Sequence, residues 1–547
     1  MREAKEILRE ILLKRDIVSE EDISEYLSDR PKKTYDPFLL LNMEAGVDLL
    51  LSEINAGTKI CIYGDYDADG VTSVCIMYSV LRHLTDNIMY YIPSRFDEGY
   101  GLNTDAVKNI ADAGAGLMIT VDCGSVSYDE VEYAKQLGLK VIVTDHHSID
   151  DVRADCILIN PHQKECTYPF SELAGCGVAF KMCQAVQKRT GLPKKVITDV
   201  LDLAAVGTVG DIVSLTDENR TIVKYGLNKI NSRSRRSLAE LASAISLDWI
   251  TSENIAFGIA PHINAAGRMA SADEAVKLFR ADDDSVIQRQ VEKLTAFNRE
   301  RKEKQNEAYV ACTEKITGEE NIMILEMDDI HEGIGGIVAG KIKENYHRPV
   351  IIVTPSGEGY LKGTGRSIPK IDIYALLKRH DSFFERFGGH KSACGFLLRK
   401  DVFQGFRNAV EIDVAEMKKA DSEIFDKKKE WDIEISPGEI TIGLARTLEL
   451  MEPFGQGNPR PVFLMKNVIP GDVRFMGSDE THARFTADAA GWVQTVTGHG
   501  VECVLFQRAQ ELKDLMCSGK PVDITGTVSL KTWRGRESVQ FIIEEME

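Results

Sequence analysis

The chain has 547 residues, 43% of them hydrophobic and 28% charged, and a formal net charge of −19. This length exceeds what one hydrophobic core usually organises, so we expect roughly three or four domains. The absence of a run of about 20 apolar residues excludes a membrane span, and eleven cysteines without a C-x-x-C pair argue against disulfides and a zinc–thiolate site. We therefore expect a cytoplasmic protein with reduced thiols.

Residues 1–45 are predicted to form a short helical lead, and the segment from residue 59 to about 275 alternates strand-like with helix-like patterns. Such alternation is typical of an α/β domain with a parallel sheet. In an open parallel sheet, the residues that follow the strands meet at one edge, where ligands bind. We therefore expect the functional residues of this domain at its strand ends.

Three carboxylates follow the first apolar run of this domain, as the run 59–63 leads into Asp65, Asp67 and Asp69. The pattern D-x-D-x-D-G also opens an EF-hand loop. That loop needs a preceding helix and a glutamate at its twelfth position, where this chain has Ile76. The remaining alternative is a solvated turn at a helix N-terminus, where the helix dipole favours carboxylates.

Two further strand-like runs end in similar residues. Asp122 follows the run 117–121, and Asp145, His146 and His147 follow the next one. Like charges at converging positions repel each other unless a cation offsets them. The repetition therefore favours a metal centre over a solvated turn, and carboxylate with imidazole ligands suits Mn²⁺ or Mg²⁺.

The rest of the chain predicts a connecting helix and two more domains. Residues 285–320 begin with a stretch rich in Gln, Glu, Lys and Arg that indicates one long helix. A second α/β domain is predicted over 321–428, and the two α/β domains should face each other across a cleft. Residues 429–547 contain short strand-like runs, and their size suits an OB-fold, a common platform for single-stranded nucleic acids.

These motifs resemble those of the DHH phosphoesterase superfamily. The matching residues are Asp67 and Asp69, Asp122, Asp145 to His147, and Gly210-Asp211-Ile212-Val213. Three further stretches are similar to the RecJ family of bacterial exonucleases, namely residues 263–268 (INAAGR), 388–390 (GGH) and 453–459 (PFGQGNP). The resemblance runs from about residue 45 to the C-terminus. One departure is Tyr63, where many RecJ-like sequences have His; Asp65 is expected to compensate.

The resemblance implies a DHH catalytic domain over 46–284, a DHHA1-type substrate-binding domain over 321–428 and an OB-fold over 429–547. It further implies a metal-dependent 5′ to 3′ exonuclease that degrades single-stranded DNA to mononucleotides in DNA repair and recombination. Single-stranded DNA is then the substrate. A single-strand-binding protein and a helicase are the implied partners, and no membrane is involved.

The resemblance also assigns residues. It implies two Mn²⁺ or Mg²⁺ ions held by Asp65, Asp67, Asp69, Asp122, His146 and Asp211, with Asp122 as the bridge. His147 is expected to contact the scissile phosphate or a nearby water and not a metal, and Asp145 to orient the ring of His146, since metal-bound imidazoles usually need such a partner. The implied substrate-binding residues, whose arginines are expected in turns, are Arg95, Arg268, Thr364, Arg366, Gly389 and His390.

Two other functions stay open at this point. A phosphodiesterase for short oligonucleotides or cyclic dinucleotides would not need the additional segment 429–547. A non-catalytic single-strand-binding scaffold of the same fold would be expected to have lost metal ligands, which this chain retains. The net charge of −19 is unfavourable for nucleic-acid binding, so we expect a basic groove, with the basic run 531–536 contributing.

Overall fold

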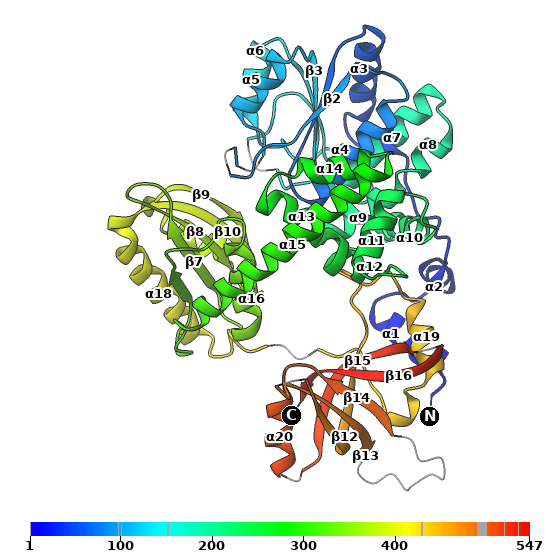
Figure 1. Cartoon of the computed structure of the whole chain (residues 1–547), viewed down its shortest axis with the longest axis vertical. Coiled ribbons are helices and arrows are strands. Elements are labelled where there is room, and N and C mark those ends of the chain that lie inside the picture. The colour runs from blue at the N-terminus through cyan, green and yellow to red at the C-terminus, as the bar shows by residue number, and fades with distance from the viewer. Residues whose placement is uncertain are drawn as a thin grey trace.

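The computed structural model describes residues 2–96, 98–99, 101–149, 152–427, 430–477, 479–489, 500–518, 520–533 and 535–546. The predicted boundary between residues 428 and 429 and one member of the basic run, Arg534, lie outside these residues. Three sheets organise the described chain. Figure 1 shows them in three separate lobes, with both termini at the lobe that carries the C-terminal sheet.

The first sheet is parallel throughout and has the strand order β2-β1-β3-β4-β5. The strand bounds are β1 Ile60–Gly64, β2 Ile88–Tyr91, β3 Leu117–Val121, β4 Lys140–Thr144 and β5 Ile157–Ile159. All residues of β1 and β3 are buried, as expected when helices cover both faces of a parallel sheet. From β1 the chain continues to β2 on one side of it and then crosses back to β3 on its other side. The strand order therefore reverses between β1 and β3, and this is the switch point where ligands bind in such sheets.

Helices cover the two faces of this sheet. One face packs against α3 (Met43–Asn55), α4 (Ala68–Leu81) and α7 (Gly175–Thr190), and the other against α5 (Thr104–Asp112) and α6 (Tyr128–Gln136). Alternate residues of β1 divide between the two cores, with Ile60 and Ile62 in one and Cys61 and Tyr63 in the other. The sheet therefore has no solvent-exposed face, and only its strand ends can present a site.

The strands of this domain end at residue 159, and after a loop over 160–174 the regular elements up to residue 284 are all helices among the described residues, contrary to the alternation predicted from residue 59 to about 275. The helices are α8 (Lys194–Thr198), α9 (Leu201–Gly210), α10 (Asp217–Asn231), α11 (Arg236–Ala244), α12 (Ser252–Asn254), a π-helical turn η2 (Ile255–Ile259), α13 (Ala260–Met269) and α14 (Asp273–Arg280). The 30-residue helix α15 (Asp284–Thr313) then leads to the second α/β domain. It ends at Thr313, so residues 314–320 of the predicted connecting helix are not helical.

The second α/β domain has a mixed sheet in the order β6-β7-β8-β10-β9. Its elements are β6 (Met323–Glu326), α16 (Gly335–Tyr346), β7 (Val350–Pro355), β8 (Tyr360–Arg366), α17 (Ile373–Lys378), β9 (Phe384–His390), β10 (Ala393–Arg399) and α18 (Phe403–Ala420). Helix α16 packs against α15 and against β7 and β8. This contact fixes the N-terminus of α16 on the side of the sheet that faces the first domain.

The C-terminal sheet closes on itself, because β12 pairs with both β13 and β15 in the order β11-β12-β13-β14-β16-β15. Its elements are β11 (Ile433–Glu434), α19 (Ile442–Glu449), β12 (Val462–Met476), β13 (His482–Ala489), β14 (Val501–Leu505), α20 (Ala509–Ser518), β15 (Val522–Trp533) and β16 (Arg536–Met546). The helical lead joins this core: α1 (Ala4–Lys14) buries Ile7, Ile11 and Leu12 in it. The first helix is thus packed with the last domain.

All eleven cysteines are free thiols, in agreement with the prediction. Among the described residues, none of the helices is both long enough and apolar enough to cross a membrane.

Candidate metal centre

The carboxylates after β1 are held by backbone N–H groups. Asp67 is the N-cap of α4, and its Oδ1 accepts hydrogen bonds from the N–H groups of Asp69 and Gly70 at 2.9 and 3.0 Å. The buried Asp69 carboxylate accepts from the N–H groups of Gly175 (2.7 Å) and Cys176 (2.9 Å) at the start of α7. Two helix N-termini therefore orient these carboxylates with donors that cost no side-chain entropy.

Gly175 is a site residue that the sequence did not reveal. A Cβ at this position would lie 2.4 Å from Asp122 Oδ1, so only glycine lets α7 approach the strand ends this closely. Its partner Asp69 is 106 positions away in the sequence, and no local pattern links the two. Only the packing of α7 on the sheet brings them together.

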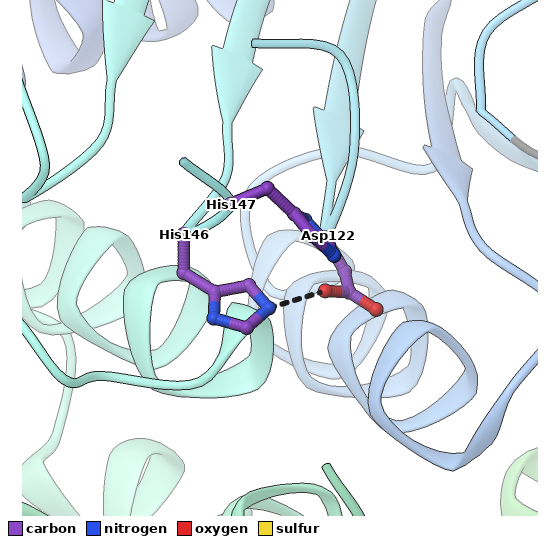
Figure 2. Close-up of side chains that lie close together, drawn as sticks. All are labelled: Asp122, His146 and His147. Carbon is purple, nitrogen blue, oxygen red and sulfur yellow. Dashed lines mark ion pairs between the residues drawn. The ribbon is translucent and has the colours of Figure 1, made fainter. Parts of the chain in front are cut away.

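Asp122 follows β3 with a φ of +62°, a left-handed conformation that Asp tolerates better than most residues. The residue is 2% exposed, and its Oδ1 lies 3.2 Å from Nε2 of His146. Figure 2 shows the His146 ring directed at the Asp122 carboxylate, with both side chains at the ends of neighbouring strands. The predicted convergence of strand ends thus brings these two residues into contact.

Asp145 contacts a different histidine from the one expected. Its Oδ1 lies 2.7 Å from Nδ1 of His147 and also accepts from the backbone N–H of His146, while its Oδ2 accepts from the N–H of Ser125 at 2.9 Å. The expectation that Asp145 orients the His146 ring is therefore wrong. The tight turn after β4 directs the ring of His147 back onto Asp145 and leaves Nε2 of His146 facing the other carboxylates.

These contacts shift the protonation of His147. Burial would lower the pKa of His147, but the hydrogen bond and the charge of Asp145 raise it to about 9. Burial would raise the pKa of Asp145, yet His147 holds it below its ordinary value. The pair is therefore an ion pair, and it places a positive charge next to the carboxylate cluster.

Asp211 approaches the same cluster from the C-terminal end of α9. It is the C-cap of that helix, and its Oδ2 lies 3.5 Å from Nε2 of His146. The next residue, Ile212, has a φ of +64°, which is rare for a β-branched side chain. The negative end of the α9 dipole adds to the negative potential of the cluster.

The cluster is electrostatically unfavourable by itself. Burial, followed by the charge of neighbouring carboxylates, raises the pKa of Asp65 to about 8 and of Asp211 to about 9. The pKa values of Asp67 and Asp122 are raised for the same reasons. Asp65 Oδ1, Asp122 Oδ1 and His146 Nε2 are buried without a hydrogen-bond partner. Unpartnered buried oxygens and an imidazole nitrogen among converging carboxylates are a donor set that fits a hard divalent cation.

The potential ligand atoms fall into three groups, in each of which all atoms lie within 4.8 Å of one another. These groups are Asp65, Asp67 and Asp122; Asp69, His146 and Asp211; and Asp122, His146 and His147. The structure thus brings together all six predicted metal ligands and His147, and Asp122 is the carboxylate shared by two groups. These are the groups found among the described residues.

Tyr63 faces away from this cluster. Its hydroxyl donates to the carbonyl of Gly101 at 2.7 Å, and its ring stacks on Tyr91 with 5.7 Å between centroids. The side chain belongs to the core on the α5 and α6 side of the sheet. The residue that departs from the family pattern is therefore a core residue in this chain.

The predicted substrate residues lie where the two α/β domains meet. Arg268 donates to the carbonyl of Gly333 at 2.8 Å, which joins α13 to the segment before α16. The Arg95 guanidinium lies over the ring of Tyr66, with 4.8 Å to the centroid, and Phe96 contacts His331 edge to face. Arg268 is in α13 and not in a turn, so that part of the prediction is wrong.

The remaining predicted substrate residues are on the second sheet. Arg366 is the last residue of β8, again not a turn residue, and it donates to the carbonyl of Gly365 at 2.8 Å and to Thr364 Oγ1 at 3.5 Å. Gly389 pairs with Cys394 in the β9–β10 ladder, and His390 ends β9. Burial and then the positive charge of Arg366 lower the pKa of His390, and His147 of the first domain acts in the same direction.

Burial also lowers the pKa of Arg268 to about 9, with the charges of Arg95 and Arg301 adding to the effect. Mutual repulsion of this kind among arginines is relieved by an anion. The meeting point of the two α/β domains therefore has the charge expected of a phosphate-binding surface.

Comparison with known proteins identifies the family. The chain matches the DHH family N-terminal domain over residues 59–208, the DHHA1 domain over 319–416 and the RecJ OB domain over 431–545. It is 33% identical to the single-stranded-DNA-specific exonuclease RecJ of Escherichia coli, over 93% of this chain and 90% of that protein. The RecJ of Bacillus subtilis is also 33% identical, over 98% of this chain and 67% of that protein. The chain belongs to the RecJ family.

Solved RecJ structures have the same fold. The crystal structure of Thermus thermophilus RecJ in complex with Mn²⁺ superposes with a TM-score of 0.82 at 28% identity, covering 98% of this chain and 75% of that one. A Mg²⁺ complex of the same protein gives 0.76. The predicted family and fold class are confirmed. Both predicted metals occur in solved RecJ structures. In the present chain, the groups of Asp and His side chains in the DHH domain could hold such a metal.

Membership of the RecJ family also decides between the three functions that the sequence left open. RecJ proteins are single-stranded-DNA-specific exonucleases, and this RecJ chain matches them over nearly its full length. The phosphodiesterase for short oligonucleotides and the non-catalytic scaffold are thereby set aside.

Proposed function

We propose that this RecJ chain degrades single-stranded DNA from its 5′ end to mononucleotides, with two divalent cations, Mn²⁺ or Mg²⁺, at the strand ends of the DHH domain. The observation that carries the proposal is the position of Asp122, whose carboxylate groups with Asp65 and Asp67 and also lies 3.2 Å from Nε2 of His146, a member of the group with Asp69 and Asp211. Asp65 and Asp67 would complete one ion site, and Asp69, His146 and Asp211 the other. A carboxylate shared in this way is typical of two-metal phosphodiester hydrolysis.

When bound, the cations offset the charge of the attacked phosphate and make water a better nucleophile. The other groups belong to the chain itself. His147, kept protonated by Asp145, would donate to a non-bridging oxygen of the scissile phosphate, and its side chain is 43% exposed and so open to a ligand. Asp65 would compensate for the histidine that the family pattern often has where this chain has Tyr63.

The arginines between the two α/β domains would bind the 5′-terminal phosphate. A terminal phosphate carries more negative charge than an internal diester, and Arg suits bidentate contacts to it. Both arginines lie at the N-terminus of α16: Arg268 donates to the carbonyl of Gly333, a Cβ on Gly336 would lie 2.7 Å from the Arg366 guanidinium, and the Thr364 hydroxyl is 3.5 Å from Arg366. Fixing the strand end here would leave the first diester over the metal centre.

The remaining parts of the proposal concern how the OB domain binds the DNA strand and how paired DNA ends are opened. We assign the OB domain to holding the strand by base stacking, which contributes about 1 to 3 kcal/mol per base without touching the scissile bond. Paired ends must be opened first, at about 1.4 kcal/mol per base-pair step, so a helicase and a single-strand-binding protein are fitting partners in DNA repair. We place the domain limits at 46–284, 321–428 and 429–547, with residues 1–45 as a helical lead.

The experiment that tests this function compares 5′-phosphorylated with 5′-hydroxyl single strands, each labelled at the 3′ end, for the parent and for Arg366→Ala. The parent should prefer the phosphorylated strand and release the 3′ label last, and Arg366→Ala should lose that preference. Arg399→Ala is the control, because Arg399 is at the opposite end of the β8–β10 ladder from Arg366. Release of the 3′ label first would contradict the direction.

A further inference from the structure

The PFGQGNP motif is not used by the metal centre, yet it is built into the catalytic domain. Between α19 and β12, Gly455 and Asn458 close a tight turn through two backbone hydrogen bonds of 3.0 and 3.1 Å. We call residues 455–458 the clamp turn. The Asn458 side chain, 2% exposed, donates to the carbonyls of Met451 and Pro453 at 2.9 and 2.7 Å. A buried amide with these contacts makes the turn rigid.

The clamp turn contacts the connection between α9 and α10. The N–H of Leu215 donates to the carbonyl of Gln456 at 2.8 Å. Gly457 has a φ of +71°, and a Cβ there would lie 2.1 Å from Oγ and 3.3 Å from Cα of Ser214. The Gln456 side chain is exposed, so the contact is made by backbone atoms and depends on the absence of a side chain at position 457.

The connection that the clamp turn contacts begins at Asp211. Ile212 follows it with a φ of +64°, a conformation that a β-branched residue keeps only when its surroundings impose it. The Ile212 side chain is 70% exposed and has little packing of its own. The constraint must come from the two ends of the connection, of which one is α9 and the other is the hydrogen bond from Leu215 to Gln456.

A second set of hydrogen bonds attaches α10, the helix that follows this connection, to the residues before the clamp turn. Arg220 in the first turns of α10 is 5% exposed and donates to the carbonyls of Met451 and Glu452 at 3.0 and 2.8 Å. Ser252 at the start of α12 donates to the carbonyl of Phe454 at 2.7 Å. In Figure 1 the orange chain that leads into β12 reaches up to these catalytic helices. Residues 451–458 thus fasten the C-terminal domain to the helices around Asp211.

We propose that the clamp turn is a positioning element for Asp211, which holds this carboxylate in the geometry that metal binding requires and couples the OB domain to the metal centre. The inference rests on the proposed role of Asp211 as a metal ligand. Its physical basis is that partners outside the ligand shell set ligand orientation, and that their loss typically lowers metal affinity about 10–100-fold.

The test is calorimetric titration of the full chain with Mn²⁺. Gly457→Ala should weaken the Mn²⁺ affinity by about tenfold, because its Cβ would push Ser214 and the connection away. The hydrolysis rate on single-stranded DNA should return to near that of the parent at saturating Mn²⁺. Ser214→Gly combined with Gly457→Ala should restore much of the affinity, because it removes Oγ and Cβ of Ser214, the two atoms nearest to the new Cβ, and leaves only Cα at 3.3 Å. Gln456→Ala, which alters only an exposed side chain of the same turn, should bind Mn²⁺ as the parent does.

Asp211→Ala separates this inference from the proposed function. If Asp211→Ala loses a Mn²⁺ site while Gly457→Ala, with an unchanged unfolding temperature, binds Mn²⁺ like the parent, the clamp turn does not position Asp211. If Asp211→Ala itself binds Mn²⁺ normally, the ligand assignment has failed. Should Gly457→Ala not fold, Arg220→Lys tests the second attachment, since an ammonium cannot reproduce the forked contacts to the carbonyls of Met451 and Glu452, nor those to Tyr26 in the helical lead. An unchanged Mn²⁺ affinity in folded Arg220→Lys would then overturn the inference.

Discussion

The Asp145 carboxylate binds the ring of His147, with 2.7 Å between Oδ1 and Nδ1. This contact gives the two adjacent histidines different chemistry. Burial lowers the pKa of His146, which suits a neutral metal ligand, whereas His147 is kept cationic. One turn after β4 thus supplies both a metal ligand and a positive charge for the phosphate.

The first prediction concerns this pair in the metal-free protein. The His147 ring should titrate near pH 9, and Asp145→Asn should bring its pKa down to or below the ordinary value of about 6.5. Because the folded pKa of His147 exceeds the unfolded one while that of Asp145 is lowered, the pair's contribution to stability is complete between about pH 4 and 6.5, is lost as the pH rises through about 9, and is also lost in acid as Asp145 takes up a proton. NMR titration of the ring resonances measures this shift. Identical titration curves in parent and variant would contradict the assignment.

The second prediction concerns Asp122. Asp122→Ala should lower hydrolysis of single-stranded DNA by more than about 100-fold, since even partners outside the ligand shell are worth about 10–100-fold. The unfolding temperature of the metal-free protein should not fall, because the variant removes one of several buried carboxylates that repel each other. Thermal denaturation without metal, followed by a nuclease assay at saturating Mn²⁺, checks both parts. Turnover near that of the parent would contradict the two-ion assignment.

The third prediction separates Tyr63 from Asp65. Asp65→Asn should raise the Mn²⁺ concentration needed for half-maximal activity, since it weakens a buried potential ligand. Tyr63→Phe should leave the metal dependence unchanged and destabilise the fold by about 0.5–1.5 kcal/mol, because the half-buried carbonyl of Gly101 loses its donor. Metal titration and urea denaturation of both variants give the comparison. Equal metal dependence in the two variants would disprove the compensation by Asp65.

The fourth prediction concerns a buried ion pair inside the catalytic domain, between α7 and α10. Lys181 Nζ lies 2.8 Å from Glu218 Oε1, with side chains 0% and 1% exposed, and Lys181 also donates to the carbonyl of Tyr35. Glu218→Gln should destabilise the protein by about 3–5 kcal/mol, because it leaves an uncompensated buried ammonium. Glu20→Gln, which breaks the exposed pair with Arg9, should change stability by less than about 0.5 kcal/mol. Urea unfolding of the two variants would show whether the difference exists.

The sequence predicted those features that follow from local pattern. The apolar runs of β1, β3 and β4 and the acidic or histidine residues after them determine the parallel sheet and its functional edge. Local pattern could not predict that Gly175 donates to Asp69, or that α1 packs in the core of the last domain, because both depend on contacts between residues more than 100 positions apart. Asp145 contacts the ring of His147 and not that of His146 because of the conformation of the turn after β4, which residue types alone do not specify.

The measurement that tests the account most directly is the anomalous diffraction of Mn²⁺ in crystals of the parent and of Asp122→Ala. The account predicts two Mn²⁺ peaks in the parent, both in contact with Asp122, one beside Asp65 and Asp67 and the other beside Asp69, His146 and Asp211. Asp122→Ala should lose at least one of them. A single peak in the parent at saturating Mn²⁺, or two peaks of which neither contacts Asp122, would contradict the proposed centre.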